Sequence, residues 1–328
     1  DYGQPPGELI QINEGLLKIS YPLILFVLIL AFRFFNLEIY YAALALIISM
    51  SISCILGFIL IKNKYNLKLR LLTFKEYFNL IKITWPFALI TIFVSIYYNI
   101  DSVILGFFYP YEYVGFYNSA YRILMIFLVL QSMFAIIIFP KVVKSINKTK
   151  KITSNLRKLN YLMLILELPL VLLIFINSNG IIKVLFGNQY LSASPVLMIL
   201  SFNIIFVGLS IIYGSWLLIS MNKEKIMALA TFIGAIINIL LNLMIIPSYG
   251  MIGAAYTTLF SEIIVSIILY SCIKKDIKIE YIPKKIIFPL IIILILISSY
   301  ILYFHFMNSI IYSFISLVIY FLLIFIFK

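Results

Sequence analysis

The sequence predicts an all-α polytopic membrane protein with about ten transmembrane helices, and three observations support this. Of its 328 residues, 64% are hydrophobic and only 11% are charged, a balance outside the range of soluble domains. The Lys and Arg residues lie near the chain ends or in alternate gaps between apolar stretches, except Arg33, Arg122 and Lys183. Ten apolar stretches, each near the roughly 20 residues that cross a bilayer as a helix, cover positions 16–35, 39–61, 84–108, 116–140, 160–177, 195–220, 226–247, 251–272, 286–304 and 309–327.

The basic residues also predict the orientation. Loops rich in Lys and Arg stay on the cytoplasmic side of the membrane. Ten crossings then place both termini in the cytoplasm and describe a multi-pass protein of the cytoplasmic membrane. The basic clusters occupy 62–82, 141–158, 223–225 and 274–285, with Lys18 and Lys328 near the two ends.

The joint between the second and third stretches has a periodicity of its own. Leu67, Leu71, Phe74, Phe78 and Ile81 share one face of a helix, and mainly polar residues occupy the rest. This pattern predicts an amphipathic helix that lies in the inner headgroup plane. We therefore expect the main boundary of the chain at this joint.

Several functions are excluded by what the sequence lacks. It contains one histidine, His305, interpreted as an interfacial solvated imidazole, and no glycine-rich phosphate loop that ends in Lys-Ser or Lys-Thr. Cys54 and Cys272 are too few and too far apart for a disulfide framework or a metal site. The net charge of +13 lies at the headgroup level, where it favours anionic lipid over nucleic acid. We expect no catalytic residue, metal or cofactor, and hence no enzyme.

Ionisable groups inside the stretches are the functional candidates, because such groups are costly in hydrocarbon. Asp101 and Arg122 both lie roughly 10 Å below the outer surface, at 1.5 Å per residue, in neighbouring stretches. Two interpretations remain open for this pair. It forms a salt bridge that pins two helices, or it lines a cavity and exchanges partners with ions or substrate.

Two more carboxylates lie deeper. Pro169 follows Glu167 by two residues, and Gln131 in the preceding stretch lies at a similar depth in the membrane. Glu167 is therefore either a hydrogen-bonded group at a static kink or a proton or cation site. Glu262 is within reach of Asn238 or Asn242, an arrangement typical of polar contacts between closely packed helices.

Tyrosines crowd the outer half of the hairpin that the third and fourth stretches form, which also carries Asp101 and Arg122. An aromatic belt at the headgroup level explains them; alternatively, some line a cavity and stack on sugar rings. They are Tyr97, Tyr98, Tyr109, Tyr111, Tyr113, Tyr117 and Tyr121.

Three blocks in this order resemble the polysaccharide-export flippases of the multidrug/oligosaccharidyl-lipid/polysaccharide exporter superfamily. Together they span one six-helix lobe, residues 84–273. The first block is Pro86, Asn99-Ile-Asp101-Ser-Val-Ile-Leu-Gly106, Val114-Gly115-Phe-Tyr117, Ala120-Tyr-Arg122 and Pro140-Lys141; the second is Val184-Leu-Phe-Gly187, Tyr190, Ala193 and Pro195; the third runs from Asn238 and Asn242 through Pro247 and Gly250 to Ala255, Thr258 and Ser261-Glu262.

The resemblance implies a two-lobe fold that works by alternating access. Under it, residues 1–15 are a cytoplasmic flank, 16–62 the last two helices of the first lobe and 63–83 the inter-lobe helix. The second lobe is 84–273, and 274–328 are two additional helices. The first four helices of the first lobe are then expected to precede Asp1.

The resemblance further implies transport of an isoprenoid-pyrophosphate-linked oligosaccharide across the membrane. The partners would be this substrate, membrane lipids, H⁺ or Na⁺, and polysaccharide assembly enzymes. Two alternatives stay open, a multidrug cation antiporter of the same superfamily and a polytopic enzyme of polysaccharide assembly. The expected substrate-binding residues are Arg122, Asn99, Asn118, Gln131, Tyr117 and Tyr121, and the expected ion-coupling residues are Asp101, Glu167 and Glu262.

Overall fold

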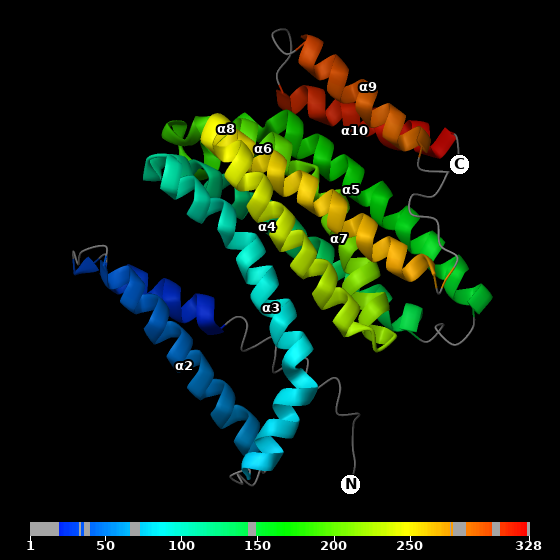
Figure 1. The fold of residues 1–328 in the computed structure, drawn as a ribbon. Coiled ribbons are helices and arrows are strands. Elements are labelled where there is room, and N and C mark those ends of the chain that lie inside the picture. Colours follow the sequence, from blue (N-terminus) through cyan, green and yellow to red (C-terminus); the bar gives the residue numbers. More distant parts are fainter. Residues whose placement is uncertain are drawn as a thin grey trace. The chain divides into compact units, whose positions relative to one another are not determined.

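A computed structural model describes the fold as helical throughout its described residues, with no strand among them (Figure 1). The chain divides into two compact units, Asp1–Asn79 and Leu80–Lys328. The all-α prediction is therefore confirmed. The structure describes residues 20–32, 34–35, 40–65, 73–143, 149–275, 277, 287–303 and 309–326.

The first unit contains a helix over Ser20–Phe32 and α2, Tyr40–Tyr65. The Ser20 hydroxyl donates to Ser53 Oγ across these two helices at 3.2 Å. The expected flank at 1–15 and positions 66–72 of the amphipathic segment lie outside the described residues.

Helix α3, Phe74–Phe108, begins in the first unit and continues into the second. Its start is capped because the Thr73 amide and hydroxyl both donate to Glu76 Oε2, at 2.8 and 2.9 Å. Residues 74–83 of the predicted amphipathic helix thus form the first turns of α3. Their place in the headgroup plane stays a prediction.

The second unit continues α3 into α4, Tyr111–Val143, through a turn at Pro110. Helix α5, Thr149–Phe186, contains Pro169. The sixth apolar stretch is bent by 43° between Asn188–Ser201 and Asn203–Leu218. Its parts are the 3₁₀ helix η1 (Asn188–Ala193), α6 (Ser194–Ser201), α7 (Asn203–Ser210) and the π-helix η2 (Ile211–Leu218).

Helix α8, Glu224–Lys274, is a helical hairpin (Figure 1). Gly250 breaks it with φ 56° and ψ −138°, a backbone conformation that side chains with a Cβ rarely adopt. The two halves pack against each other, and Thr257 donates to the Asn242 side chain across them. The break separates the two stretches expected at 226–247 and 251–272.

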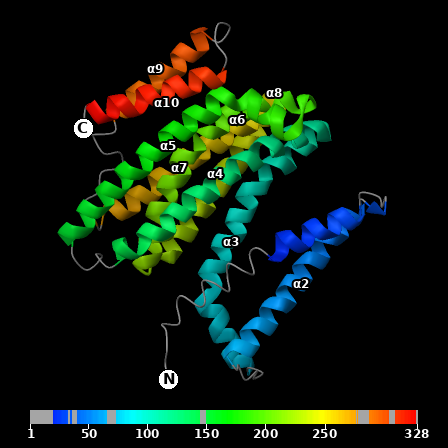
Figure 2. The ribbon, with the colours of Figure 1, turned by 180° about the vertical axis from the view of Figure 1, so that it is seen from behind.

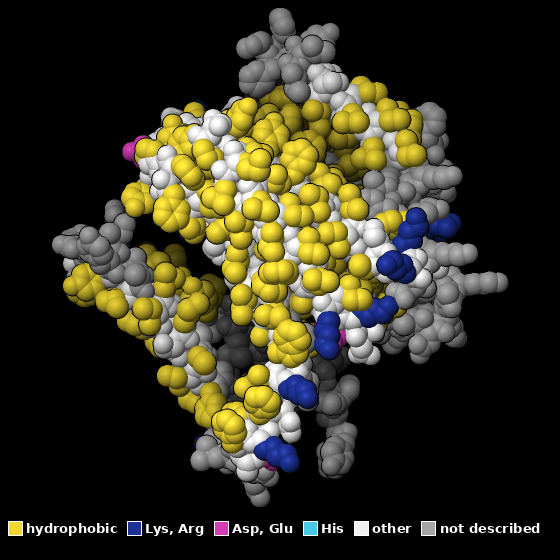
Figure 3. All heavy atoms as spheres, in the orientation of Figure 1, with side chains coloured by type: hydrophobic (Ala, Val, Ile, Leu, Met, Phe, Trp, Pro, Cys, Tyr) yellow, Lys and Arg dark blue, Asp and Glu magenta, His cyan; other side chains and the backbone are white. Residues whose placement is uncertain are grey.

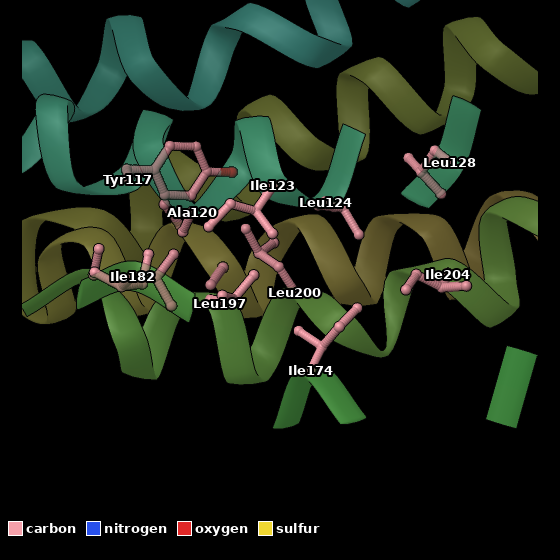
Figure 4. Packing of buried hydrophobic residues seen from close by; sticks show 14 of the residues in the cluster. Tyr117, Ala120, Ile123, Leu124, Leu128, Ile174, Ile182, Leu197, Leu200 and Ile204 are labelled. Atoms are coloured by element: carbon pink, nitrogen blue, oxygen red, sulfur yellow. The ribbon is translucent and has the colours of Figure 1, made fainter. Parts of the chain in front are cut away.

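The core of this unit lies between α4, α5 and α6. One face of α4 contributes Tyr117, Ala120, Leu124 and Leu128, at spacings of three and four residues (Figure 4). These side chains meet buried residues of α5, α6 and α7, including Ile174, Ile182, Leu197, Leu200 and Ile204.

The last two helices, α9 (Ile287–Tyr303) and α10 (Ser309–Ile326), pack beside α5 (Figure 2). The Tyr300 hydroxyl donates to the Ile176 carbonyl at 2.9 Å, and Asn177 Nδ2 donates to Ser313 Oγ at 2.6 Å. These bonds satisfy polar groups that would otherwise face hydrocarbon.

The helices fit a multi-pass membrane protein. In the described residues, three helices are long and apolar enough to span a membrane, and the bent pair makes a fourth. Four shorter apolar helices accompany them, and the described parts of all ten expected stretches lie mainly in helices. On the face shown in Figure 3, hydrophobic side chains cover α8, whereas Lys and Arg gather near the end where α8 begins and finishes.

We predict that Gly234→Ala destabilises the α8 hairpin. A Cβ at Gly234 would overlap Val265 Cγ2 in the opposite half of α8. Overpacking of this kind costs about 1–3 kcal/mol. The midpoint of thermal unfolding of the detergent-solubilised protein should fall, and Val265→Ala in the same chain should restore much of it.

Gly115→Ala is the matched control, because a Cβ there meets nothing within 4 Å. In α4 this change should be neutral or stabilising by about 0.5–1 kcal/mol. Equal effects of the two alanines would contradict tight packing at Gly234.

Candidate functional site

A buried hydrogen-bond network surrounds the Asp101 carboxyl, which is 1% exposed. The Tyr117 hydroxyl of α4 donates to Asp101 Oδ2 at 2.6 Å, and Thr258 Oγ1 of α8 donates to the same oxygen at 2.6 Å. The Asn242 amide, from the first half of α8, donates to Asp101 Oδ1. Asp101 therefore ties α3 to α4 and to both halves of α8.

The donors to Asp101 have partners of their own. Asn242 Nδ2 also donates to Asn238 Oδ1 at 3.1 Å, and the Tyr97 hydroxyl donates to the Thr258 carbonyl at 3.3 Å. In this conformation the Asp101 carboxyl thus accepts hydrogen bonds from two hydroxyl groups and one amide N–H, and a carboxylate is a ligand that hard cations prefer.

The prediction of a salt bridge between Asp101 and Arg122 is wrong, because the hydrogen bonds to Asp101 come from other residues. Arg122 is exposed, and no hydrogen bond or ion pair joins it to another residue that the structure describes. Arg122 follows Tyr117, the residue that Asp101 contacts, by five residues, which is about 7.5 Å further along α4. Asp101 contacts Tyr117, and Arg122 lies about 140° further around α4, at about 100° per residue.

A polar stripe follows the exposed side of the α3–α4 hairpin, and we define it as Ser95, Asn99, Ser102, Asn118 and Arg122. On each helix these residues recur at spacings of three or four, so they share a face. The Ser102 hydroxyl donates to Asn118 Oδ1 at 2.9 Å and joins the two helices. Asn99, whose amide donates to the Ser95 carbonyl at 2.8 Å, and Arg122 are both exposed.

The polar stripe and the Asp101 network lie on the two sides of the contact between α3 and α4. Asp101 pairs with Tyr117 on the buried side, and the next residues along each helix, Ser102 and Asn118, pair on the other side. A movement of α3 relative to α4 must therefore change both contacts.

The expected tyrosines lie partly within the protein. Tyr117 is 1% exposed and bonded to Asp101, so it does not offer its face to a sugar in this conformation. Its ring stacks on Tyr121 at 5.9 Å, and the Tyr121 ring lies 6.2 Å from that of Tyr98. Tyr121 is half-buried and stays a candidate for the substrate side.

Gln131 and Glu167 form a separate buried pair between α4 and α5. Gln131 Nε2 donates to Glu167 Oε1 and, at 3.1 Å, to the Ile204 carbonyl. Gly208 of α7 makes room, because a Cβ there would overlap both side chains. Among the described residues, Glu167 Oε2 and Gln131 Oε1 have no hydrogen-bond partner. Burial removes Gln131 from direct substrate contact in this conformation.

Glu262 lies at a cavity of about 370 Å³ between α3, α7, η2 and α8. Among the described residues, no hydrogen bond joins Glu262 to Asn238 or Asn242, because Asn242 donates to Asp101 and to Asn238. Sequence reasoning did not place Thr257 and Ser210 at a site. Both are small hydroxyl residues on apolar helices, which are common in helix packing.

The described helices and this buried polar network define a multi-pass helical membrane protein, and its fold is similar to that of two solved transporter structures. The chain superposes on the lipid II flippase MurJ in an inward closed conformation with a TM-score of 0.73 and 20% identity, over 95% of this chain and 66% of that one. A multidrug resistance MATE family transporter of the MOP superfamily, in an outward-facing conformation, gives a TM-score of 0.53 and 16% identity, over 62% and 46% of the two chains.

A family model described as polysaccharide biosynthesis protein matches residues 19–195, so the chain belongs to that family. The chain is 32% identical over 163 residues to the probable low-salt glycan biosynthesis flippase Agl15 of Haloferax volcanii, covering 49% of this chain and 34% of that protein. It is 27% identical over 279 residues to the capsular polysaccharide biosynthesis protein CapF of Staphylococcus aureus, covering 82% and 67%. The match with Agl15 thus spans about a third of that protein.

We predict that Thr258→Val and Tyr117→Phe each destabilise the protein. Each removes one of the two donors to Asp101 Oδ2, and the loss of one hydrogen bond while the other donor remains costs about 0.5–1.5 kcal/mol. Thermal unfolding in detergent should show both losses, and the double variant should deviate from their sum because the donors share one oxygen.

Ser102→Ala serves as the matched control. It removes a hydrogen bond of similar length on the same helix, but at a partly buried position. A loss of stability as large as that of Thr258→Val would show that burial of Asp101 is not the reason.

Proposed function

We propose that the protein moves an isoprenoid-pyrophosphate-linked oligosaccharide across the cytoplasmic membrane by alternating access. The observation that carries this proposal is the exposed guanidinium of Arg122 within an apolar helix, on the polar stripe. A charged group in this position favours a water-filled or anion-binding surface over lipid. The name of the flippase relative Agl15 supports the same class of transport.

The polar stripe gives each part of such a substrate a partner. Arg122 suits a pyrophosphate, because a guanidinium binds phosphate oxygens through two parallel hydrogen bonds. Asn99 and Asn118 provide amide groups for sugar hydroxyls, and Tyr121 provides a ring for stacking. Asn118 has its oxygen engaged by Ser102, which leaves its amide nitrogen to donate.

We further propose that a cation gradient, of H⁺ or Na⁺, drives the cycle through Asp101. A buried carboxyl beside two hydroxyl groups and the Thr258 carbonyl supports a small cation, and the contact between α3 and α4 links this site to the polar stripe. Glu167 and Glu262 are additional carboxylates for the same coupling. Movement of α3 against α4 would then connect cation binding with substrate exposure.

The proposed orientation places both termini and the basic ends of α8 in the cytoplasm. Lys223, Lys225 and Lys274 at the two ends of the hairpin support this, because basic residues favour the cytoplasmic side. Contact with polysaccharide assembly enzymes belongs to the same proposal, since such enzymes use the translocated lipid.

A multidrug cation antiporter is the second candidate. The observation that favours it is Glu262 beside Tyr97 and Tyr98 in one cavity, because a carboxylate and aromatic rings suit an organic cation.

We predict that Arg122→Ala abolishes translocation and that Arg122→Lys retains part of it. Removal of the guanidinium leaves the pyrophosphate without its partner, whereas Lys keeps the charge without the planar geometry. The measurement is accessibility of a fluorescent isoprenoid-pyrophosphate saccharide on the opposite leaflet of liposomes that contain the protein without ATP.

Lys183→Ala is the control for charge. Lys183 is also exposed, but lies in the last turn of α5 rather than on the polar stripe. Normal translocation by Arg122→Ala would remove the substrate assignment, and efflux of organic cations without lipid translocation would favour the antiporter.

We predict that Asp101→Asn uncouples transport from the cation gradient. The amide keeps the size of the side chain but has no negative charge to attract a cation. In liposomes with an imposed H⁺ or Na⁺ gradient, translocation by this variant should no longer respond to the gradient. A response equal to that of the unmodified protein would exclude Asp101 as the coupling group.

A further inference from the structure

The cavity beside Glu262 is mainly apolar, but hydroxyl groups and one carboxylate lie among its lining residues. Glu262 is 6% exposed and is the one charged side chain among the described residues that line the cavity. The lining hydroxyl groups belong to Thr91, Ser95, Tyr97, Tyr98, Ser210, Ser215 and Thr231. A carboxylate at this position repels pyrophosphate and attracts cations.

The walls of the cavity indicate that it contains water. Ser210 Oγ is buried and has no hydrogen-bond partner among the described residues. A buried hydroxyl without a partner is costly, and a volume of 370 Å³ has room for several waters at about 30 Å³ each. Ser210 also directly precedes the π-helix η2, an element that is frequent at functional sites.

The cavity borders the Asp101 network through Tyr97. This side chain lines the cavity, and its hydroxyl donates to the carbonyl of Thr258, whose own hydroxyl donates to Asp101. Tyr97 precedes Asp101 by one helical turn, and Thr258 precedes Glu262 by one turn. The Asp101 and Glu262 carboxyls are thus separated by about 6 Å along the helix axes. The Tyr97 phenol lies between the cavity and the network.

We propose that this cavity is the vestibule through which a small inorganic monovalent cation passes between water and the Asp101 site. Glu262 concentrates the cation, the lining hydroxyls replace part of its hydration shell, and Tyr97 is the partition that closes the site. The inference rests on the proposed cation coupling at Asp101. It assigns a role to Glu262 that is separate from Asp101 itself, and it adds Tyr97 as a positioning residue.

The vestibule is tested by charge-selective labelling of a cysteine on its wall. Ser215→Cys is introduced into the full chain with Cys54→Ser and Cys272→Ser, and its reaction rates with a cationic and an anionic methanethiosulfonate are compared in membranes. The cationic reagent should react faster. Glu262→Gln should lower the ratio of the two rates roughly tenfold, and Na⁺ should slow the reaction whereas choline should not.

Ser192→Cys is the matched control, because Ser192 is exposed on η1 and does not line the cavity. Its rate ratio should be the same with Glu262 and with Glu262→Gln. An unreactive Ser215→Cys, or a ratio that Glu262→Gln leaves unchanged, would overturn the vestibule.

The partition is tested by uptake of radioactive sodium into liposomes without lipid-linked substrate. Tyr97→Ala should raise this leak several-fold, whereas Tyr97→Phe keeps the ring and should leave it low. An equal leak in both variants would overturn the role of the Tyr97 ring. Charge-selective labelling requires no translocated lipid, so it can succeed where lipid translocation fails, and Asp101→Asn should leave its charge preference intact.

Discussion

A carboxyl group buried in a membrane must find its hydrogen-bond donors within the protein, and the Asp101 carboxyl imposes this condition on four helical segments at once. Its donors come from α4 and from both halves of α8. A shift of the first half of α8 would leave Asp101 Oδ1 without its donor, whereas Oδ2 loses its donors only when α4 and the second half of α8 both move away. The network therefore holds α3, α4 and the two halves of α8 together, and the cation proposed to bind at Asp101 would regulate the positions of these helices.

The α3–α4 hairpin carries this constraint to the surface. Successive residues on each helix are about 100° apart, so one pair lies in the network and the next pair lies on the polar stripe. An exchange of partners at one side alters the fit at the other through a single helix contact. The proposed coupling of cation and substrate thus needs no long chain of intermediates.

Much of the fold could be predicted from the sequence, because apolar length and charge distribution are one-dimensional properties. The break at Gly250 was expected as a gap between two stretches, although not as a single residue with positive φ. The site was harder to predict than the fold. Depth in the membrane follows from residue number, whereas the neighbour that a given side chain meets depends on how the helices pack. Asp101 and Arg122 were therefore placed at one level but wrongly joined. Thr258, whose neighbour Thr257 also belongs to the network, gave no signal that distinguishes a ligand from an ordinary packing residue.

The hairpin of α8 has a consequence for experimental access to the protein. Because its two halves reverse direction within a few residues of Gly250, this end of the hairpin presents almost no loop. An antibody, a protease or an inserted epitope would find little backbone to engage there. The segments around Pro110 and Asn188–Ala193 interrupt the long helices instead, and they are the better places to attach a reporter without opening the core.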